Sequence, residues 1–115
     1  MYLSSLLKVN TNDHQWGVTV DDRISRLITR QMYVSGVLIL TVERNSPAAI
    51  AGLRGTSRVG DSRLNPGDII QQVGSHRVED TESLLDALDQ YAIGDRVNIH
   101  FQRDGKSQET TVALE

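Results

Sequence analysis

The stretch NSPAAIAGL, Asn45–Leu53, carries the strongest local signal in the chain. Ser46 is a residue type favoured as a helix N-cap, because its side-chain oxygen can accept a hydrogen bond from a free backbone N–H. Proline is common at the first helical position, which Pro47 would occupy, and glycine is common just after a helix end, where Gly52 stands. The stretch therefore predicts one short helix that is built mainly of alanine.

Strands are predicted on both sides of this helix. Before it, SGVLILTVE (35–43) is a continuous run of β-branched residues and leucine, typical of a strand buried on both faces. After it, GDIIQQVGSHRV (67–78) predicts a strand, a tight turn near Gly74 and a return at Val78. The last predicted element is a hairpin over 96–115, in which hydrophobic residues alternate and RDGK forms the turn.

Two longer amphipathic helices are also predicted. The first lies in DDRISRLITRQMY (21–33), with Asp21 or Asp22 as the N-cap. Its apolar residues at helical spacing are Ile24, Leu27, Ile28 and Met32, and arginines occupy the other face. The second lies in TESLLDALDQY (81–91), with Asp80 or Thr81 as the N-cap.

The size and composition of the chain limit what it can be. A chain of 115 residues, 38% hydrophobic and 23% charged, is ordinary for one globular domain. The 12 basic and 15 acidic residues give a net charge of −3 without a basic cluster on one element, which argues against nucleic-acid binding. The absence of cysteine excludes disulfides and thiolate metal ligands. No apolar run approaches ~20 residues, so no insertion of this chain into a membrane is expected.

The sequence contains no pattern for catalysis or metal binding. Its histidines are His14, His76 and His100, in three different predicted elements and without a metal-ligand neighbour one helical turn away. No G-x-S-x-G motif and no phosphate-binding glycine loop is present. We therefore predict no catalytic residue, no metal ligand and no cofactor. A small independent hydrolase is disfavoured because a nucleophile with its base is missing.

The block SPA–A–AGL followed by GD-I-I resembles the PDZ domain, in the version attached to HtrA/Deg-type serine proteases. The resemblance continues through DTESLLDAL, GDRVNIHFQRDG and TTVALE. It implies a β-rich α+β fold, all-β in some schemes: a partly open antiparallel β-barrel or sandwich of about five or six strands, capped by two or three helices. Residues 1–13 are then expected to be an N-terminal linker, and 14–115 the PDZ domain.

One segment departs from the family pattern. The family commonly passes from AGL to GD within a couple of residues, whereas RGTSRVGDSRLNP (54–66) intervenes here. A similar insertion is found in some Deg proteases of photosynthetic lineages. Its three arginines and one aspartate make it locally basic. The segment is interpreted as an extended surface loop, with contact to a neighbouring protease domain as an alternative.

The resemblance also implies a peptide-binding groove. In the family, a loop of the form hydrophobic–Gly–hydrophobic points backbone N–H groups at the carboxylate that ends a bound peptide. The matching residues here are Gln15, Trp16, Gly17 and Val18. Glycine inside a strand marks either a bulge or a close approach of backbone or ligand. Together with Val18, the residues Thr19 and Val20 offer a strand edge to which a peptide can add.

The opposite wall of this groove is expected to be the second amphipathic helix. Its spacing places Thr81, Leu85 and Leu88 on one stripe, while Leu84 and Ala87 lean toward the core. We therefore predict that Leu85 and Leu88 form the pocket for the last side chain of the peptide. Many PDZ domains have histidine at the first groove position of this helix, and the threonine here favours hydrophobic peptide ends.

The sequence thus predicts a non-catalytic regulatory module that binds hydrophobic C-terminal or unfolded peptide segments. The resemblance implies that the intact protein is a serine endopeptidase of protein quality control. It also implies export, to a bacterial periplasm or cell envelope or to a lumen in photosynthetic lineages, although nothing in this chain assigns a compartment. The alternative is a scaffold or secretion-complex PDZ domain that binds a fixed protein partner and is not attached to a protease.

Overall fold

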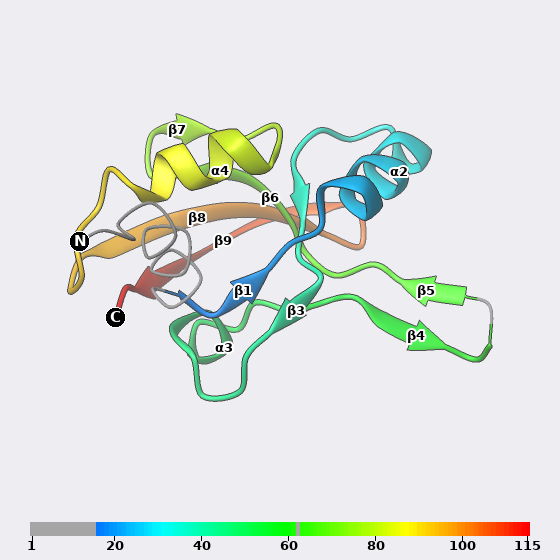
Figure 1. Cartoon of the computed structure of the whole chain (residues 1–115), viewed down its shortest axis with the longest axis horizontal. Helices are drawn as coiled ribbons and strands as arrows, with labels where there is room; N and C mark the ends of the chain where they lie inside the picture. Colours follow the sequence, from blue (N-terminus) through cyan, green and yellow to red (C-terminus); the bar gives the residue numbers. More distant parts are fainter. Residues whose placement is uncertain (1–15, 62) are drawn as a thin grey trace, which may run out of the picture.

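The computed structural model describes residues 16–61 and 63–115 and contains three antiparallel sheets (Figure 1). The five-stranded sheet consists of β2 (Val37–Leu38), β6 (Ile69–Val73), β8 (Arg96–Arg103) and β9 (Lys106–Ala113) in that order, with β7 (His76–Arg77) paired to β6. The two-stranded sheets are β1 (Val18–Thr19) with β3 (Thr41–Val42), and β4 (Ser57–Val59) with β5 (Arg63–Asn65). The predicted boundary between linker and domain lies outside the described residues.

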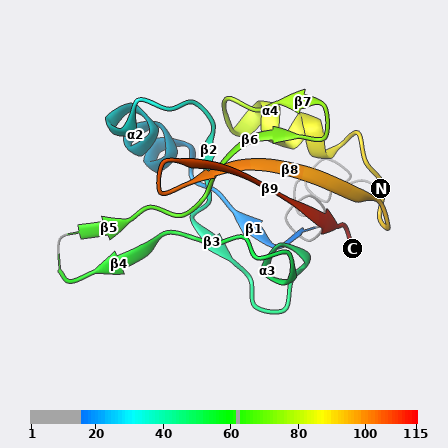
Figure 2. The same ribbon diagram turned by 180° about the vertical axis from the view of Figure 1, so that it is seen from behind.

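Three described helices cover these sheets: α2 (Asp22–Met32), α3 (Pro47–Ile50) and α4 (Thr81–Leu88). Seen from behind in Figure 2, the long β8–β9 hairpin crosses the molecule between α2 and α4 on one side and α3 on the other. The sheets stay open and do not close into a barrel. Antiparallel strands covered by these helices confirm the expected β-rich α+β class. None of these helices is long and apolar enough to cross a membrane.

Alternating side chains of β8 form the centre of the core. Val97, Ile99 and Phe101 are 1%, 0% and 3% exposed, as the alternation predicts, and they pack in one buried cluster with Trp16. The hairpin turn has two residues with positive φ, Asp104 and Gly105, which is the backbone geometry that suits the twist of two adjoining strands. The predicted hairpin is therefore confirmed.

The alanine helix is also confirmed. The side chain of Ser46 accepts a hydrogen bond from the backbone N–H of Ala49 at 3.2 Å, and Pro47 begins the helix. Gly52 follows with φ +91°, the left-handed conformation that glycine adopts without strain. The helix thus begins and ends where its flanking residues predict.

The aspartate of the GD pair is a buried structural anchor. Asp68 is 1% exposed and accepts hydrogen bonds from the Nε and Nη2 atoms of Arg103 at 2.8 and 2.7 Å. It also accepts one from the backbone N–H of Arg54 at 2.9 Å, while Arg103 donates to the carbonyl of Gly52 at 2.8 Å. The carboxylate of Asp68 raises the pKa of Arg103 above its ordinary value. This network fastens the chain after α3 to the end of β8.

The strand predicted over 35–43 is two strands. The backbone N–H of Ile39 donates to the carbonyl of Asp68 at 2.9 Å, on the side of β6. The next N–H, of Leu40, donates to the carbonyl of Thr19 at 2.8 Å, on the side of β1. The chain changes partners between these two residues, so one apolar run crosses from the five-stranded sheet to the β1–β3 sheet.

Helix α2 is confirmed, with Asp21 as its N-cap, but its buried face differs from the prediction. Leu27 is 60% exposed and Met32 36% exposed, whereas Ser25 is buried. The reason is a tertiary hydrogen bond: the hydroxyl of Ser25 accepts the backbone N–H of Leu38 at 3.0 Å. Satisfying that buried N–H turns a polar residue inward and leaves part of the apolar stripe outside.

The insertion 54–66, interpreted from the sequence as an extended surface loop, contains a hairpin that projects from the body of the molecule (Figure 1). All residues of β4 and β5 are exposed. At the base, the hydroxyl of Thr56 donates to the carbonyl of Ile39 at 2.8 Å and accepts the N–H of Gly67 at 3.0 Å. The base of the insertion is therefore part of the fold, and its strands are not.

Removing the strands of the insertion is expected to have little effect on stability. We expect that replacing 57–65 with a short glycine-containing turn changes the free energy of unfolding by less than about 1 kcal/mol, because loop-closure entropy depends weakly on length. In contrast, Thr56→Val leaves the N–H of Gly67 without its partner and costs about 1–3 kcal/mol. Urea denaturation of both variants measures the two losses. A greater loss from the shortened hairpin than from Thr56→Val would show that the strands support the domain.

Candidate functional site

Strand β1 has one strand neighbour, β3, among the described residues. The carbonyl of Gly17 accepts the N–H of Glu43, and the carbonyl of Thr19 accepts the N–H of Leu40, both at 2.8 Å. Because backbone groups alternate along an antiparallel strand, the N–H and carbonyl of Val18 face away from β3. This outward edge provides the pairing groups that an added strand needs.

The glycine beside the only tryptophan has a structural reason. Gly17 has φ +84°, and a Cβ atom on it would lie 2.6 Å from the Oγ of Ser46 and still closer to its Cβ. Ser46 cannot retreat, because its hydroxyl caps α3 and also donates to the carbonyl of Glu43 at 2.6 Å. Packing of this loop on the start of α3 therefore requires glycine whether or not a ligand binds. A substitution of Gly17 would disturb the fold as well as any ligand site.

The loop and strand predicted to bind the peptide present mainly backbone. Trp16 is 2% exposed and Val18 is 3% exposed, and both belong to the main core cluster. Thr19 is exposed and Val20 is partly buried against the same cluster. Gln15 lies outside the described residues. Burial of the side chains holds the backbone of this segment in place.

Helix α4 divides its leucines between the core and the surface. Leu84 and Ala87 are 2% and 3% exposed and pack in the core, as the spacing predicts. Leu85 is partly exposed, but Leu88 is 0% exposed and belongs to the core cluster. The structure thus separates Leu85 from Leu88, and a contact of Leu88 with a peptide stays a prediction.

The exposed part of this helix lines a cleft of about 390 Å³ between the first turns of α2 and α4. The lining residues are Asp22, Arg26, Asp80, Thr81, Glu82 and Leu85. The hydroxyl of Thr81 donates to Oδ1 of Asp22 at 3.2 Å, and Arg26 forms an ion pair with the same carboxylate. The structure therefore brings Thr81 and Leu85 together at one cleft.

Two carboxylates of this cleft are held by hydrogen bonds. The guanidinium of Arg26 lowers the pKa of Asp22, and the backbone N–H of Ser83 lowers the pKa of Asp80 at the N-cap of α4. Sequence reasoning missed Asp22 and Arg26 as neighbours of the groove helix. Their spacing of four residues predicts the ion pair on α2. Nothing in the sequence shows that this pair lies against Thr81, which is 59 residues away from Asp22.

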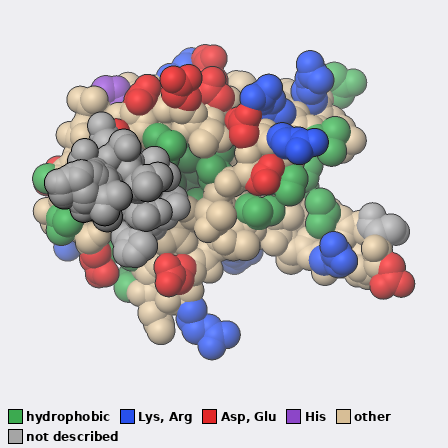
Figure 3. Space-filling view, viewed as in Figure 1, with side chains coloured by type: hydrophobic (Ala, Val, Ile, Leu, Met, Phe, Trp, Pro, Cys, Tyr) green, Lys and Arg blue, Asp and Glu red, His purple; other side chains and the backbone are tan. Residues whose placement is uncertain are grey.

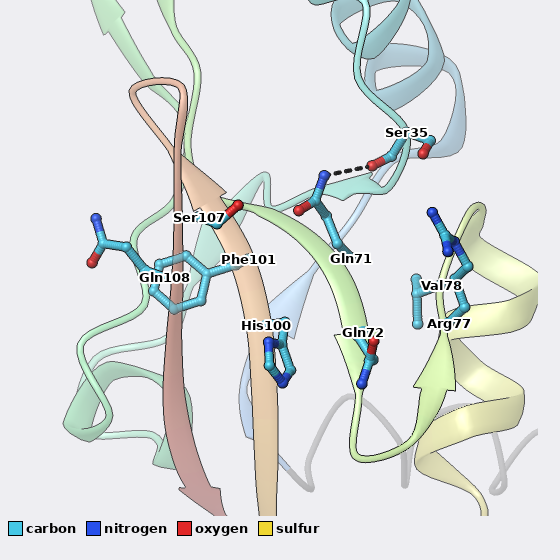
Figure 4. A pocket seen from close by; sticks show the side chains of 9 residues that line it. All are labelled: Ser35, Gln71, Gln72, Arg77, Val78, His100, Phe101, Ser107 and Gln108. Atoms are coloured by element: carbon cyan, nitrogen blue, oxygen red, sulfur yellow. Dashed lines mark hydrogen bonds between the residues drawn. The ribbon is translucent and has the colours of Figure 1, made fainter.

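A second pocket, of about 230 Å³, lies on the polar face of the five-stranded sheet (Figure 4). The side-chain amide of Gln71 crosses it and donates to the carbonyl of Ser35 at 3.1 Å. The Nε2 atom of His100, which lines this pocket, lies 3.4 Å from the Oε2 atom of Glu109. No group of three His, Asp or Glu side chains in residues 16–61 and 63–115 has the arrangement of a metal site. Among the described residues that line this pocket, no hydrogen bond joins a serine hydroxyl to His100.

The comparisons with known proteins agree with this architecture. The family model described as PDZ domain matches residues 8–114. The chain is 40% identical over 85 residues to Protease Do-like 1, chloroplastic, of Arabidopsis thaliana. The matched segment covers 74% of this chain and 19% of that protein. It is 35% identical over 91 residues to Serine protease Do-like HtrA of Lactobacillus helveticus, and this match covers 79% of this chain and 19% of that protein. The chain spans about a fifth of the length of these relatives.

Solved structures share the fold at low sequence identity. The HtrA3 PDZ domain bound to a phage-derived ligand has a TM-score of 0.63 at 18% identity, covering 87% of this chain and 84% of that one. The HtrA-type protease AlgW with a decapeptide has a TM-score of 0.63 at 20% identity, covering 97% and 35%. Because the family model matches residues 8–114, nearly the whole length of this chain, the chain belongs to the PDZ domain family.

Proposed function

We propose that this chain binds the C-terminal end of peptides by strand addition to β1. The observation that carries the proposal is the outward edge of β1, where the backbone of Val18 faces away from β3. Two of the similar structures were solved with peptide ligands, the HtrA3 PDZ domain and AlgW. A peptide that pairs with this edge would add a third strand to the β1–β3 sheet.

Each predicted residue has a role in this proposal. The loop of Gln15, Trp16, Gly17 and Val18 offers backbone N–H groups to the terminal carboxylate, and Thr19 and Val20 continue the edge. Leu85, partly exposed on α4, contacts side chains of the peptide, and Leu88 supports it from the core. The hydroxyl of Thr81 already donates to Asp22, so it is not the donor for a serine or threonine of the ligand. The hydroxyl oxygen of Thr81 can still accept a hydrogen bond, so the preference for hydrophobic peptide ends rests on the threonine that stands where many PDZ domains have histidine.

We also propose that the intact protein is a Do-like serine protease. The curated relatives carry that name, and this chain spans about a fifth of their length. In such a protein, the domain would tether exposed ends of unfolded substrates beside an adjoining protease domain. The chain itself would contribute binding and regulation and no catalytic residue. As part of the same proposal, the intact protein is exported, as the resemblance to HtrA/Deg proteases implies.

The terminal carboxylate is the direct test of this function. A hydrophobic peptide such as FGRWV, the phage-derived ligand of HtrA3, is titrated as free acid and as C-terminal amide. Hydrogen bonds from backbone N–H groups to an ionised oxygen contribute roughly 1.5–3 kcal/mol each. We therefore expect amidation to weaken binding by about tenfold or more, since ~1.4 kcal/mol is a factor of ten.

The control is the same pair of peptides with the sequence reversed, which keeps composition and charge but changes the last side chain. Binding that is equally tight for acid and amide would mean that the groove does not recognise a chain end. Absence of binding by the free acid and by a panel of other hydrophobic ends would contradict the proposed function itself.

A further inference from the structure

Another groove lies between α2 and the projecting hairpin, and none of its lining residues belongs to the cleft at Thr81 and Leu85. Its volume is about 400 Å³. Apolar side chains from both elements line it: Ile24, Leu27, Ile28 and Met32 from α2, and Leu64 and Pro66 from the insertion. Figure 3 shows hydrophobic side chains gathered in this hollow, with Lys or Arg side chains on both of its sides. We name it the α2–hairpin groove.

Exposed hydrophobic residues are concentrated on α2 and the hairpin, the two elements that form this groove. Seven large hydrophobic side chains are exposed in the described part of the chain, and five of them belong to α2, its C-cap or the hairpin. These five are Leu27, Met32, Tyr33, Val59 and Leu64. Leu27 and Leu64, at 60% and 50% exposed, lie in the groove itself. A contiguous apolar hollow with a polar rim is characteristic of an interaction site.

The rim of the groove is basic although the chain is acidic. Helix α2 and the hairpin strands with their turn carry five arginines and two aspartates, whereas the whole chain has a net charge of −3. The arginines are Arg23, Arg26, Arg30, Arg58 and Arg63. Within residues 16–61 and 63–115, only Arg26 among them has an ion-pair partner, Asp22. Arg63 lines the groove and Arg58 stands directly opposite Leu64 in the hairpin, so these two present positive charge beside the exposed leucines, whereas the arginines of α2 lie on the other face of that helix.

The two observations together specify the partner. We propose that the α2–hairpin groove is a docking surface for an acidic protein segment that carries leucine-like side chains between its carboxylates. The apolar side chains would fill the hollow between Leu27 and Leu64, and the carboxylates would face the arginines on the rim. Burial of apolar area would supply affinity, at roughly 25 cal/mol per Å², and charge complementarity would supply orientation and speed of encounter.

Two other occupants fit the surface less well. An anionic membrane would meet protruding apolar side chains, whereas here they line a hollow between two elements. A second copy of this chain would have to offer an acidic surface with exposed leucines. On its most acidic element, α4, the only leucine that is not buried, Leu85, is partly exposed and sits in the cleft of the proposed peptide site, and the exposed Ile93 lies beyond the end of the helix. The partner is therefore expected to be a different protein surface.

The test uses a labelled synthetic amphipathic peptide with leucines on one face and glutamates flanking them. A matched peptide has lysine in place of every glutamate, and both are amidated so that neither offers a terminal carboxylate to the β1 site. We expect the 115-residue chain to bind the acidic peptide at least about tenfold more tightly than the basic one. Added salt should weaken this binding, because exposed charges are screened.

The hairpin itself supplies a matched pair of variants. Leu64 lines the groove, whereas Val59, whose side chain alternates to the other face of the hairpin, does not. Leu64→Ser is expected to weaken the acidic peptide about fivefold to tenfold, and Val59→Ser to leave it unchanged. Both positions are about half exposed, so thermal melting should find both variants folded.

The outcomes separate this proposal from the peptide function. Binding of the acidic peptide that survives Leu64→Ser, or equal binding of acidic and basic peptides, overturns the docking proposal and leaves the β1 site untouched. Binding to anionic vesicles that Leu64→Ser removes would identify a membrane as the occupant instead. A molar mass, measured by sedimentation, that increases with protein concentration and decreases in Leu64→Ser would identify a second copy of this chain as the occupant. Either result would replace the acidic protein segment.

Discussion

Asp68→Ala is expected to lower the free energy of unfolding by about 3–5 kcal/mol, the usual loss when one partner of a buried ion pair is removed. The carboxylate is 1% exposed and accepts three hydrogen bonds, two from Arg103 and one from the backbone of Arg54. Its removal leaves the guanidinium of Arg103, 19% exposed, with the carbonyl of Gly52 as its remaining hydrogen-bond acceptor in the described residues. A domain of this size is stable by roughly 5–15 kcal/mol, so the variant loses a large share of its stability.

The matched control is Asp86→Ala, which removes an exposed carboxylate from the middle of α4 and should change stability by no more than about 0.5 kcal/mol. Arg103→Ala should cost at least as much as Asp68→Ala, because it leaves the more deeply buried of the two charges without its partner. Urea denaturation of the three variants is the measurement. Similar losses for Asp68→Ala and Asp86→Ala would mean that the buried network does not hold the fold.

Leu88→Ala is expected to cost about 2–5 kcal/mol, the range for deleting a fully buried leucine from a packed core. Leu85→Ala should cost less than about 1.5 kcal/mol, because this side chain is partly exposed at the cleft. Among variants that remain folded, we expect Leu85→Ala to weaken the binding of a free-acid hydrophobic peptide more than Leu88→Ala does. Leu85→Ala should weaken binding by loss of a direct contact.

Measuring unfolding and peptide titration on the same two proteins separates the roles of these leucines. Leu84→Ala serves as the second core reference, since Leu84 is 2% exposed. If Leu85→Ala proved as destabilising as Leu88→Ala, the orientation of α4 described above would be wrong. If neither variant changed peptide affinity, the stability order would stand and the groove role of Leu85 would fall.

Local chemistry determines where the short elements begin and turn. The helix after Ser46, the helix after Asp80 and the tight hairpin at Asp104 all begin or turn at residues whose own side chain or backbone preference requires it. These preferences act over about four residues, so they can be read from adjacent letters. The block SPAAIAGL with GDII also identifies the family, because it combines such a helix with the buried aspartate that anchors it.

Burial of a whole element, in contrast, depends on what lies opposite it. The spacing of α2 predicts an apolar stripe, but the N–H of Leu38 needs an acceptor and receives it from Ser25, so the helix rotates and Leu27 stays exposed. The same holds for α4, where helical spacing groups Leu88 with Leu85 although the core contains only Leu88. A face of a helix is chosen by its neighbours, and its neighbours are distant in sequence.

The sequence by itself therefore determined the caps, the turns, the alternation of β8 and the family. Only the tertiary structure decided that Gly17 is required by contact with Ser46, that the run 35–43 changes sheets, and that the insertion places Leu64 across a groove from Leu27. The physical reason is range: propensities and caps are satisfied within one turn of chain. Close packing and buried hydrogen bonds instead join residues that meet only after the chain has folded.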